Sequence, residues 1–314
     1  MAFYSPDPGM GQQLERLVAA LEGQGRPGLA RQLSITWLRY AESPLSSAVP
    51  ALGSEERQPI LLPRGASLGG DRLRYPASVV KLFYLAAVEA WLQRQLLVDG
   101  AELRRALADM VQASGNEATS LVVDLLSGTT SGPSLPPERF ASWVRQRQLV
   151  NAWLQQLAWP ELGGCNVCQK TWQEGPYGRE HDFYGLAGQD NRNRLSTDAT
   201  ARLLHGVICD ELVSPPASRR MKELLQRSLD PALRAADPGN QVDGFLGAGL
   251  PPDRARLWSK AGWMSQARHD AAYVEIEGGS PFLLVVFSEG ERCARDETLL
   301  PELGRQVAEA CGGG

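Results

Sequence analysis

Hydrophobic and polar positions alternate with a period of two near both ends of the chain, as they do in strands. After a short amphipathic helix, the segments 30–40 (ARQLSITWLRY) and 59–65 (PILLPRG) each predict a strand. Near the other end, three further strands are predicted at 254–263, 267–278 and 281–290. A final helix then closes the chain. The two ends therefore supply one antiparallel sheet, which the terminal helices cover.

The middle of the chain has the periodicity of helices. Residues 78–97 are apolar on nearly every face, which is typical of a buried helix. Other helices are predicted at 101–113, 114–128, 138–158, 196–212 and 218–229. The glycine-rich stretch 160–195 has no such period, and a loop of this length is usually functional. We expect one α+β unit over 1–314, with a sheet subdomain (28–75 and 245–314) and a helical subdomain (76–244).

Composition narrows the partners that the chain can have. It is 43% hydrophobic and 22% charged, which favours a globular protein over a disordered one. The formal net charge of -4 argues against general binding of nucleic acid or an anionic membrane surface. No run approaches the ~18 apolar residues that a membrane span needs. We expect a monomer.

Only four of the 32 basic residues are lysines, and two of these, Lys81 and Lys260, lie in apolar segments. Pro76 suits a first helical turn, so Ser78 is expected at a helix start with Lys81 one turn further on the same face. Burial penalises the charged form of lysine and lowers its pKa, so Lys81 can act as a base toward the Ser78 hydroxyl. The alternative is a chance Ser-x-x-Lys match.

Two further groups have a chemical and a structural interpretation. In the predicted turn 114–116 (Ser-Gly-Asn), Ser114 can relay a proton and Asn116 can orient lysine or substrate, or the turn is simply a helix N-cap. In a predicted strand, Lys260 is followed by Ala261 and Gly262, and this glycine lets a substrate or another backbone approach closely. The alternative is an edge-strand lysine that prevents aggregation.

The order of these three groups carries more information than each alone. S-x-x-K, S-D-N and K-T-G form the signature of class A β-lactamases and penicillin-binding proteins. The sequence resembles this superfamily of active-site serine enzymes over most of residues 30–310. The segment 193–208 also looks like the helix that follows the Ω-loop of the family, and the C-terminal hairpin is similar.

The resemblance implies a β-lactamase/DD-peptidase-like fold and a role for each matching residue. Ser78 would be the acylated nucleophile, Lys81 its base or proton relay, Ser114 a proton relay, and Asn116 would orient lysine or substrate. Lys260 would add positive potential for an anionic substrate. The backbone N–H groups of Ser78 and Trp263 would form the oxyanion hole. The substrate would be a small-molecule β-lactam or an acyl-peptide, and no cofactor or metal is implied.

The sequence departs from the family pattern in the second and third groups. Gly115 stands where class A enzymes have aspartate. Ala261 replaces a threonine or serine, which removes a hydroxyl expected to bind the substrate carboxylate. The span from Ser78 to Ser114 is short for the family, so we expect a trimmed helical region and a more open cleft.

The largest departure concerns deacylation, because the Ω-loop pattern Glu-x-x-Leu-Asn is missing. The candidate carboxylates are Glu174, Glu180 and Asp182. Glu180 is the first choice, since it adjoins Arg179 and precedes 196–197 by a suitable distance. The alternative is that these carboxylates only hold the loop, by pairing with Arg179, Arg192 or Arg194.

Other chemistries have weaker support. The Gly-x-Ser-x-Gly match at 65–69 is not followed directly by a helix, so it is interpreted as a glycine-rich loop and not as a nucleophile elbow. The pair Cys165/Cys168 has no second pair or histidine pair, which favours ordinary thiols. The three histidines are isolated, and only His269 is a candidate to face a cleft.

Three functions remain open. The first is a class A-like β-lactamase that is acylated at Ser78. The second is a DD-peptidase, penicillin-binding or esterase relative that deacylates poorly, and the third is a binding module without chemistry. The chain shows no export signal, which indicates the cytoplasm, whereas the resemblance implies a periplasmic or secreted enzyme acting on peptidoglycan or antibiotics.

Overall fold

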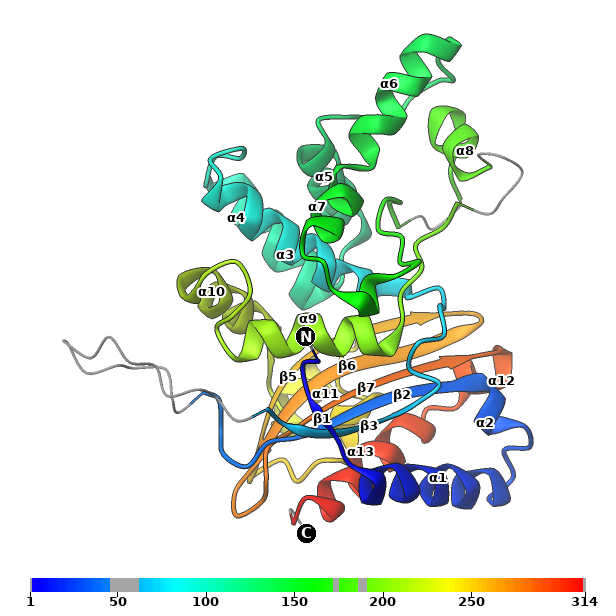
Figure 1. The fold of residues 1–314 in the computed structure, drawn as a ribbon, viewed down its shortest axis with the longest axis vertical. Helices are drawn as coiled ribbons and strands as arrows, with labels where there is room; N and C mark the ends of the chain where they lie inside the picture. The colour runs from blue at the N-terminus through cyan, green and yellow to red at the C-terminus, as the bar shows by residue number, and fades with distance from the viewer. Residues whose placement is uncertain (1, 46–61, 172–174, 186–190, 313–314) are drawn as a thin grey trace, which may run out of the picture.

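The computed structural model describes residues 2–45, 62–171, 175–185 and 191–312, and these contain one seven-stranded sheet in the order β1-β3-β2-β7-β6-β5-β4. Its strands are β1 (Ser5–Pro6), β2 (Leu33–Arg39), β3 (Arg64–Leu68), β4 (Gln226–Arg227), β5 (Ala255–Met264), β6 (Ala267–Ile276) and β7 (Phe282–Glu289). Only β1 and β3 pair in parallel, and the other neighbours pair antiparallel. Strands from both chain ends thus form one sheet (Figure 1).

Helices cover both faces of this sheet. Figure 1 shows α1 and α13 below it and α9 across its upper face, with the other long helices stacked beyond α9. The terminal helices are α1 (Pro8–Gly23), α2 (Leu29–Gln32), α12 (Glu291–Arg295) and α13 (Leu299–Ala310). The middle of the chain supplies α3 (Val80–Gln93), α4 (Ala101–Ala108), α5 (Asn116–Ser127), α6 (Pro137–Arg147), α7 (Leu149–Gln156), α8 (Gly178–Tyr184), α9 (Thr197–Ile208), α10 (Pro215–Leu225) and α11 (Pro231–Ala236). The predicted α+β fold is confirmed.

The sheet separates two hydrophobic cores. Leu283, Val285 and Phe287 of β7 pack toward the helices of the middle segment, whereas Leu284 and Val286 pack toward α1 and α13. Successive strand residues point to opposite faces, so a strand buried on both faces must be apolar at nearly every position. This explains why β7 reads as a continuous hydrophobic run.

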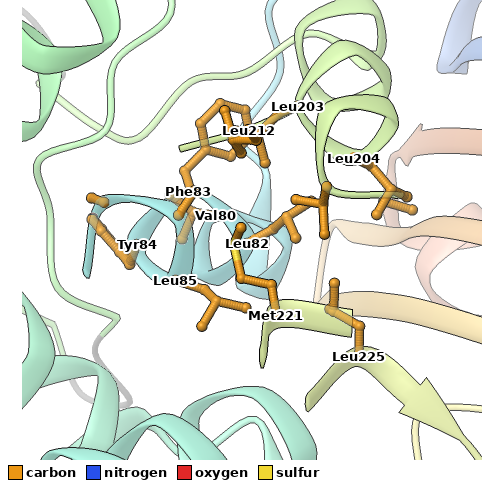
Figure 2. Close-up of a cluster of buried hydrophobic side chains, with 14 of the residues drawn as sticks. Val80, Leu82, Phe83, Tyr84, Leu85, Leu203, Leu204, Leu212, Met221 and Leu225 are labelled. Carbon is orange, nitrogen blue, oxygen red and sulfur yellow. The ribbon is translucent and has the colours of Figure 1, made fainter. Parts of the chain in front are cut away.

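Helix α3 is buried almost all round, as its composition predicts. Figure 2 shows its side chains surrounded by those of α9, α10 and the loop between them. The labelled members are Val80, Leu82, Phe83, Tyr84, Leu85, Leu203, Leu204, Leu212, Met221 and Leu225. Since α3 carries Lys81 in its first turn, this packing fixes the position of the lysine relative to the sheet.

Several predicted elements are wrong. The stretch 160–195, expected to be a loop, contains α8, and the predicted helix 218–229 is α10, which begins at Pro215 and ends at Leu225, where β4 follows. Strand β3 runs from Arg64 to Leu68, where it pairs with β2, and so lies further along the chain than the predicted strand 59–65. Residues 59–61 lie outside the described part of the chain. Residues 65–69 are therefore mainly strand and not loop. The predicted helix 138–158 breaks at Gln148, which lets Trp143 pack against Phe183 while Trp153 enters the core beside α3.

Candidate active site

Ser78 lies in a short 3₁₀ turn, Ala77–Val79, that leads directly into α3. Ala77 has a φ of 46°, a left-handed conformation that costs a non-glycine residue roughly 1–2 kcal/mol. Such strain is typical of functional positions. In the first turn of a helix the backbone N–H groups have no intrahelical acceptor. The half-buried Ser78 stands at this helix start, although the N–H groups of Val79 and Val80 already donate to the carbonyls of Pro76 and Ala77.

Lys81 is fully buried, and its Nζ has three acceptors on the segment that follows α4. It donates to the Ser114 carbonyl, to Ser114 Oγ at 3.2 Å and to Asn116 Oδ1 at 2.9 Å. Burial lowers the pKa of Lys81 to about 7, against an opposing effect of the Asp109 carboxylate. Near neutral pH a large fraction of Lys81 is therefore uncharged and able to accept a proton.

Ser114 follows a single π-helical turn, Asp109–Ala113, and has a φ of 57°. This conformation directs its Oγ between two lysine Nζ atoms, Lys81 at 3.2 Å and Lys260 at 3.0 Å. The N-cap position of α5 is Gly115, and no side chain caps the helix. The alternative interpretation of 114–116 as a simple N-cap is therefore wrong.

The Asp109 carboxylate lies beside position 115. A Cβ on Gly115 would overlap this carboxylate, so the Asp109 side chain would have to move if position 115 carried a side chain. The same carboxylate raises the pKa of Lys81 against the effect of burial. A negative charge thus stands beside this turn although it comes from position 109, which sequence reasoning missed.

Strand β5 passes directly against the Ser78 turn. A Cβ on Gly262 would lie 2.9 Å from the Pro76 carbonyl oxygen and 3.0 Å from the backbone nitrogens of Ser78 and Val79. The predicted close approach of another backbone to Gly262 is therefore present, with the Ser78 turn as the partner. The next residue, Trp263, continues along the same strand, so the two backbone N–H groups expected to form an oxyanion hole belong to adjoining segments.

Lys260 is fully buried and donates to Ser114 Oγ, to the Ala261 carbonyl at 2.8 Å and to Gln241 Oε1. Burial lowers its pKa well below the ordinary value, and the nearby Lys81 and Arg227 lower it further. A solvent-exposed edge lysine that prevents aggregation would show none of these features, so that alternative is wrong.

Trp263 is 59% exposed, and two neighbouring groups contact its indole. Its Nε1 donates to the Ala294 carbonyl at 2.9 Å, and the Arg268 guanidinium carbon lies 5.8 Å from the ring centroid. Trp263 and Ala261 lie on the same face of β5, opposite to the face of Lys260 and Gly262.

His269 supports the Ser78 turn from behind the strand and does not face a cleft. It is fully buried, opposite Gly262 in the β5–β6 register. Its Nδ1 accepts from the Ser288 N–H at 3.0 Å, so Nε2 carries the proton and donates to the Tyr75 carbonyl at 2.8 Å. Burial lowers the pKa of His269 to about 4, which keeps the ring neutral in this role.

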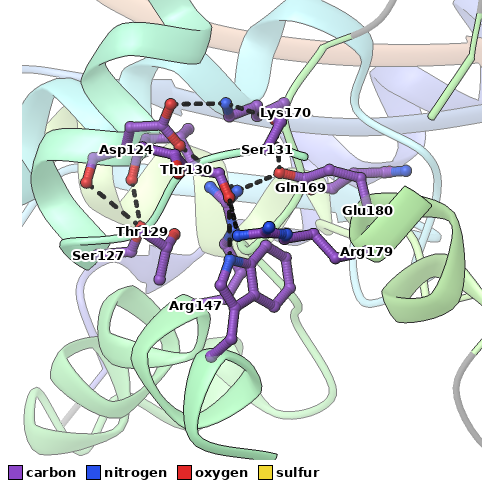
Figure 3. Close-up of polar contacts among 12 residues, drawn as sticks. Asp124, Ser127, Thr129, Thr130, Ser131, Arg147, Gln169, Lys170, Arg179 and Glu180 are labelled. Carbon is purple, nitrogen blue, oxygen red and sulfur yellow. Dashed lines mark hydrogen bonds and ion pairs between the residues drawn. The ribbon is translucent and has the colours of Figure 1, made fainter. Parts of the chain in front are cut away.

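The first-choice loop carboxylate, Glu180, is engaged elsewhere. It is buried on α8, where it forms an ion pair with Arg147 and accepts from Ser131 Oγ at 2.9 Å. Figure 3 shows that this cluster joins α5, α6, α8 and the loops between them. Lys170 extends it through Asp124 at 2.7 Å and Ser131 at 2.8 Å.

The pairing that was considered for Glu180 thus exists, with Arg147 as the partner in place of the three arginines near it in sequence. Arg179 donates instead to the Pro133 carbonyl at 3.0 Å. Asp182 lies half-buried on α8, and Glu174 lies outside the described residues. None of the described hydrogen bonds of Glu180 reaches Ser78 or Lys81.

The residues with weaker support as catalytic or metal-binding groups have structural roles. Ser67 lies within β3 and donates to Asp198, which is incompatible with a nucleophile elbow. Burial raises the pKa of the Cys168 thiol to about 12, and Cys165 and Cys168 are both free. His205 packs in the core, where its Nδ1 lies 3.0 Å from the Tyr40 hydroxyl. Within the described ranges no three His, Cys, Asp or Glu side chains group to hold a metal, and no helix could span a membrane.

Behind the site, Asp270 is a buried carboxyl that should make stability depend on pH. It lies opposite Ala261, its Oδ2 accepts from the Leu246 N–H at 3.1 Å, and its Oδ1 has no partner among the described residues. Burial raises its pKa to about 7. Between about pH 4, where an unfolded aspartate titrates, and about pH 7, the folded state holds the extra proton, so stability falls as pH rises.

Asp270→Asn should remove this contribution, which amounts to a slope of up to about 1.4 kcal/mol per pH unit. Denaturant unfolding of the wild type and the variant at pH 4.5 and pH 8 measures it, because contributions of other carboxylates cancel in the difference. The variant should gain stability relative to the wild type at the higher pH. An unchanged difference between the two pH values would contradict the assignment.

Comparisons with known proteins bear on the family and on the fold. Residues 94–311 match the model of the β-lactamase enzyme family, a range that contains Ser114 and Lys260 and begins after Ser78. Among curated protein sequences, none matches the chain significantly.

Solved structures of low sequence identity share the fold. A β-lactamase from Sphaerobacter thermophilus has a TM-score of 0.62 at 15% identity, over 94% of this chain and 97% of that one. PBP-A has a TM-score of 0.60 at 16% identity, over 99% and 98%. The class A β-lactamase of the last common ancestor of Gram-negative bacteria has a TM-score of 0.58 at 20% identity, over 94% of this chain and 98% of that one. Since the family match spans well over half of the residues of this chain, the chain belongs to the β-lactamase enzyme family.

Proposed function

We propose that this protein is an active-site serine hydrolase that forms an acyl-enzyme at Ser78 and hydrolyses the amide bond of a β-lactam. The observation that carries the proposal is the position of the Ser114 hydroxyl between two buried lysine amines, beside the helix start that presents Ser78. A merely structural serine and lysine pair would not need two desolvated lysines on one hydroxyl, since each costs free energy to bury.

The chemistry assigned to these groups is acyl transfer. Uncharged Lys81 takes the proton of Ser78 as its Oγ attacks the lactam carbonyl. The N–H groups of Ser78 and Trp263 stabilise the negative charge on the carbonyl oxygen. Ser114 gives a proton to the departing nitrogen and is resupplied from the lysines bonded to it. Water then hydrolyses the ester on Ser78. For a point mutant of PBP-A, an acyl-enzyme complex with penicillin G is recorded, which is the type of intermediate proposed here.

A second candidate is a DD-peptidase or esterase relative that acylates readily and deacylates slowly. Two observations favour it. Glu180 is held in its ion pair with Arg147 and so is poorly placed to activate water. Ala261, which stands where the family pattern has threonine or serine, has no hydroxyl with which to bind a substrate carboxylate.

Intact-protein mass spectrometry over time after mixing with penicillin G separates these functions. The first function predicts an adduct that decays within seconds to minutes, and the second predicts an adduct that persists. Ser78→Ala should form neither. An adduct of equal extent in Ser78→Ala would contradict both functions. If the wild type gives no adduct and leaves the penicillin G unhydrolysed, this β-lactam is not a substrate, and a panel of nitrophenyl esters with the same control tests the esterase.

A further inference from the structure

Outside the three sequence groups, one buried side chain touches the candidate site directly. Gln241 lies between α11 and the short turn Leu246–Gly249 and is 6% exposed. Its Oε1 accepts from Lys260 Nζ, and its Nε2 donates to the carbonyls of Val111 at 2.9 Å and Gln112 at 2.7 Å. Carbonyl oxygens only accept, so the amide orientation is dictated by its partners. All of its hydrogen-bonding groups are therefore used at the site.

The two carbonyls that Gln241 contacts belong to the π-helical turn that precedes Ser114. The last carbonyls of a helix lack intrahelical partners and need donors from elsewhere. The Arg227 guanidinium also donates to these two carbonyls, to that of Val111 at 2.8 Å and to that of Gln112 at 3.2 Å. It donates as well to the Ser259 carbonyl of β5 at 3.0 Å. Gln241 and Arg227 thus join the turn that carries Ser114 to the strand that carries Lys260.

The Lys260 amine has three acceptors, which are Gln241 Oε1, the Ala261 carbonyl and Ser114 Oγ. A lysine amine is a rotating donor with no fixed direction of its own, so these three acceptors define its orientation. Without Gln241 one donor would lose its partner inside a fully buried site, and Lys260 would be free to rotate away from Ser114.

We propose that Gln241 is a positioning residue of the hydrolase, which orients Lys260 so that it donates to Ser114 Oγ and holds the Ser114 turn at that distance. Because both lysines donate to this oxygen, the hydroxyl proton of Ser114 is directed away from them, toward the leaving group. The inference rests on the proposed function for its role in catalysis, but the contact with Lys260 can be tested without any substrate.

The charged and titratable groups around Lys260 determine how a variant at Gln241 would change the pKa of this lysine. Lys81 of α3 and Arg227 of β4 disfavour its charged form, together with burial, whereas Asp270 of β6 favours it. An acceptor at Gln241 also favours the charged form. Gln241→Met, which removes that acceptor, should lower the pKa of Lys260, and Gln241→Glu, which adds a negative charge beside it, should raise the pKa.

Because the chain has only four lysines, NMR of protein labelled at the lysine side chains can follow the titration of each one. Each signal is assigned by its loss in the corresponding Lys→Arg variant. The expected result is an opposite shift of the Lys260 titration in the two Gln241 variants. Lys170 and Lys222, which have ion-pair partners of their own, should be unaffected and serve as internal controls. A Lys260 titration that is the same in wild type and variants would overturn the proposal.

The catalytic consequence is read from acylation by penicillin G, or by the nitrophenyl ester that acylates the wild type. Gln241→Met should slow acylation by about 10- to 100-fold, the usual loss for a hydrogen bond to a charged group. The matched control is Gln306→Met on α13, a glutamine that bonds to Glu302 on the far side of the sheet, and it should acylate at the wild-type rate.

If Gln241→Met fails to fold, Gln241→Glu is the deciding variant, because Arg227 still donates to both turn carbonyls in it. Shifted lysine titrations with no acylation of the wild type by either probe would refute the proposed function and leave the contact intact. Unshifted titrations with normal wild-type acylation would refute the role of Gln241 alone.

Discussion

Lys81→Met should slow acylation of Ser78 by about 10²- to 10⁴-fold, the usual effect of removing a general base. Methionine fills a similar volume and removes the proton acceptor that lies one turn from Ser78. The wild-type rate should also rise with pH through about 7, because Lys81 is a base only in its uncharged form and its pKa is lowered to about 7 by burial. This rise should be absent in the variant.

Rates of adduct formation measured from pH 5 to 9 test both statements. Lys222→Met is a suitable control, since Lys222 is another largely buried lysine that pairs with Asp210 at 2.8 Å. It should lower thermal stability and leave the rate of the folded protein unchanged. A Lys81→Met variant that acylates within tenfold of the wild type would show that another group takes the proton.

Gly262→Ala should slow acylation by about 10²- to 10³-fold, which is the usual cost of losing one oxyanion donor. The new Cβ would lie 2.9–3.0 Å from backbone atoms of Pro76, Ser78 and Val79. Backbone atoms cannot rotate aside as a side-chain tip can, so β5 and the Ser78 turn must separate. The two N–H groups on either side of the substrate carbonyl would then no longer converge on its oxygen.

The matched control is Gly11→Ala in α1, where an added Cβ meets no atom within 4 Å. It should acylate normally and melt at or above the wild-type temperature, because alanine favours a helix over glycine. The interpretation fails if Gly262→Ala reacts at the wild-type rate, or if its loss of rate only follows loss of folded protein in circular dichroism.

The parts of the site that could be predicted from the sequence are those with a local signal. Ser78 and Lys81 are three residues apart in a segment whose composition already requires a buried helix, so their shared environment follows from helix geometry. The strand of Lys260 and Gly262 is recognisable by its length and flanking turns. Glycine at 262 indicated a close approach, although the sequence does not say which backbone approaches.

The contacts that the sequence did not indicate join residues far apart along the chain. Gln241 lies 130 positions from Val111, and His269 lies 194 from Tyr75. No periodicity links such pairs, and an isolated polar residue in a loop has the same sequence signature whether it is exposed or holds a buried lysine. Glu180 shows the opposite error, since its neighbours in sequence suggested Arg179 while the fold brought Arg147 to it from α6.

The sequence by itself determined most of the longer helices and strands of this protein, because helix and strand patterns depend on neighbouring residues and on which faces must be buried. It thereby determined the α+β class and the helix start that presents Ser78. It did not indicate the short elements β1, β4, α8 and α11. Only the tertiary structure decided how the site is completed. The left-handed backbone at Ala77 and Ser114, the Asp109 carboxylate in place of a side chain at 115, and the acceptors of Lys260 all arise where separate segments meet. Such contacts are set by packing in three dimensions, which no local pattern encodes.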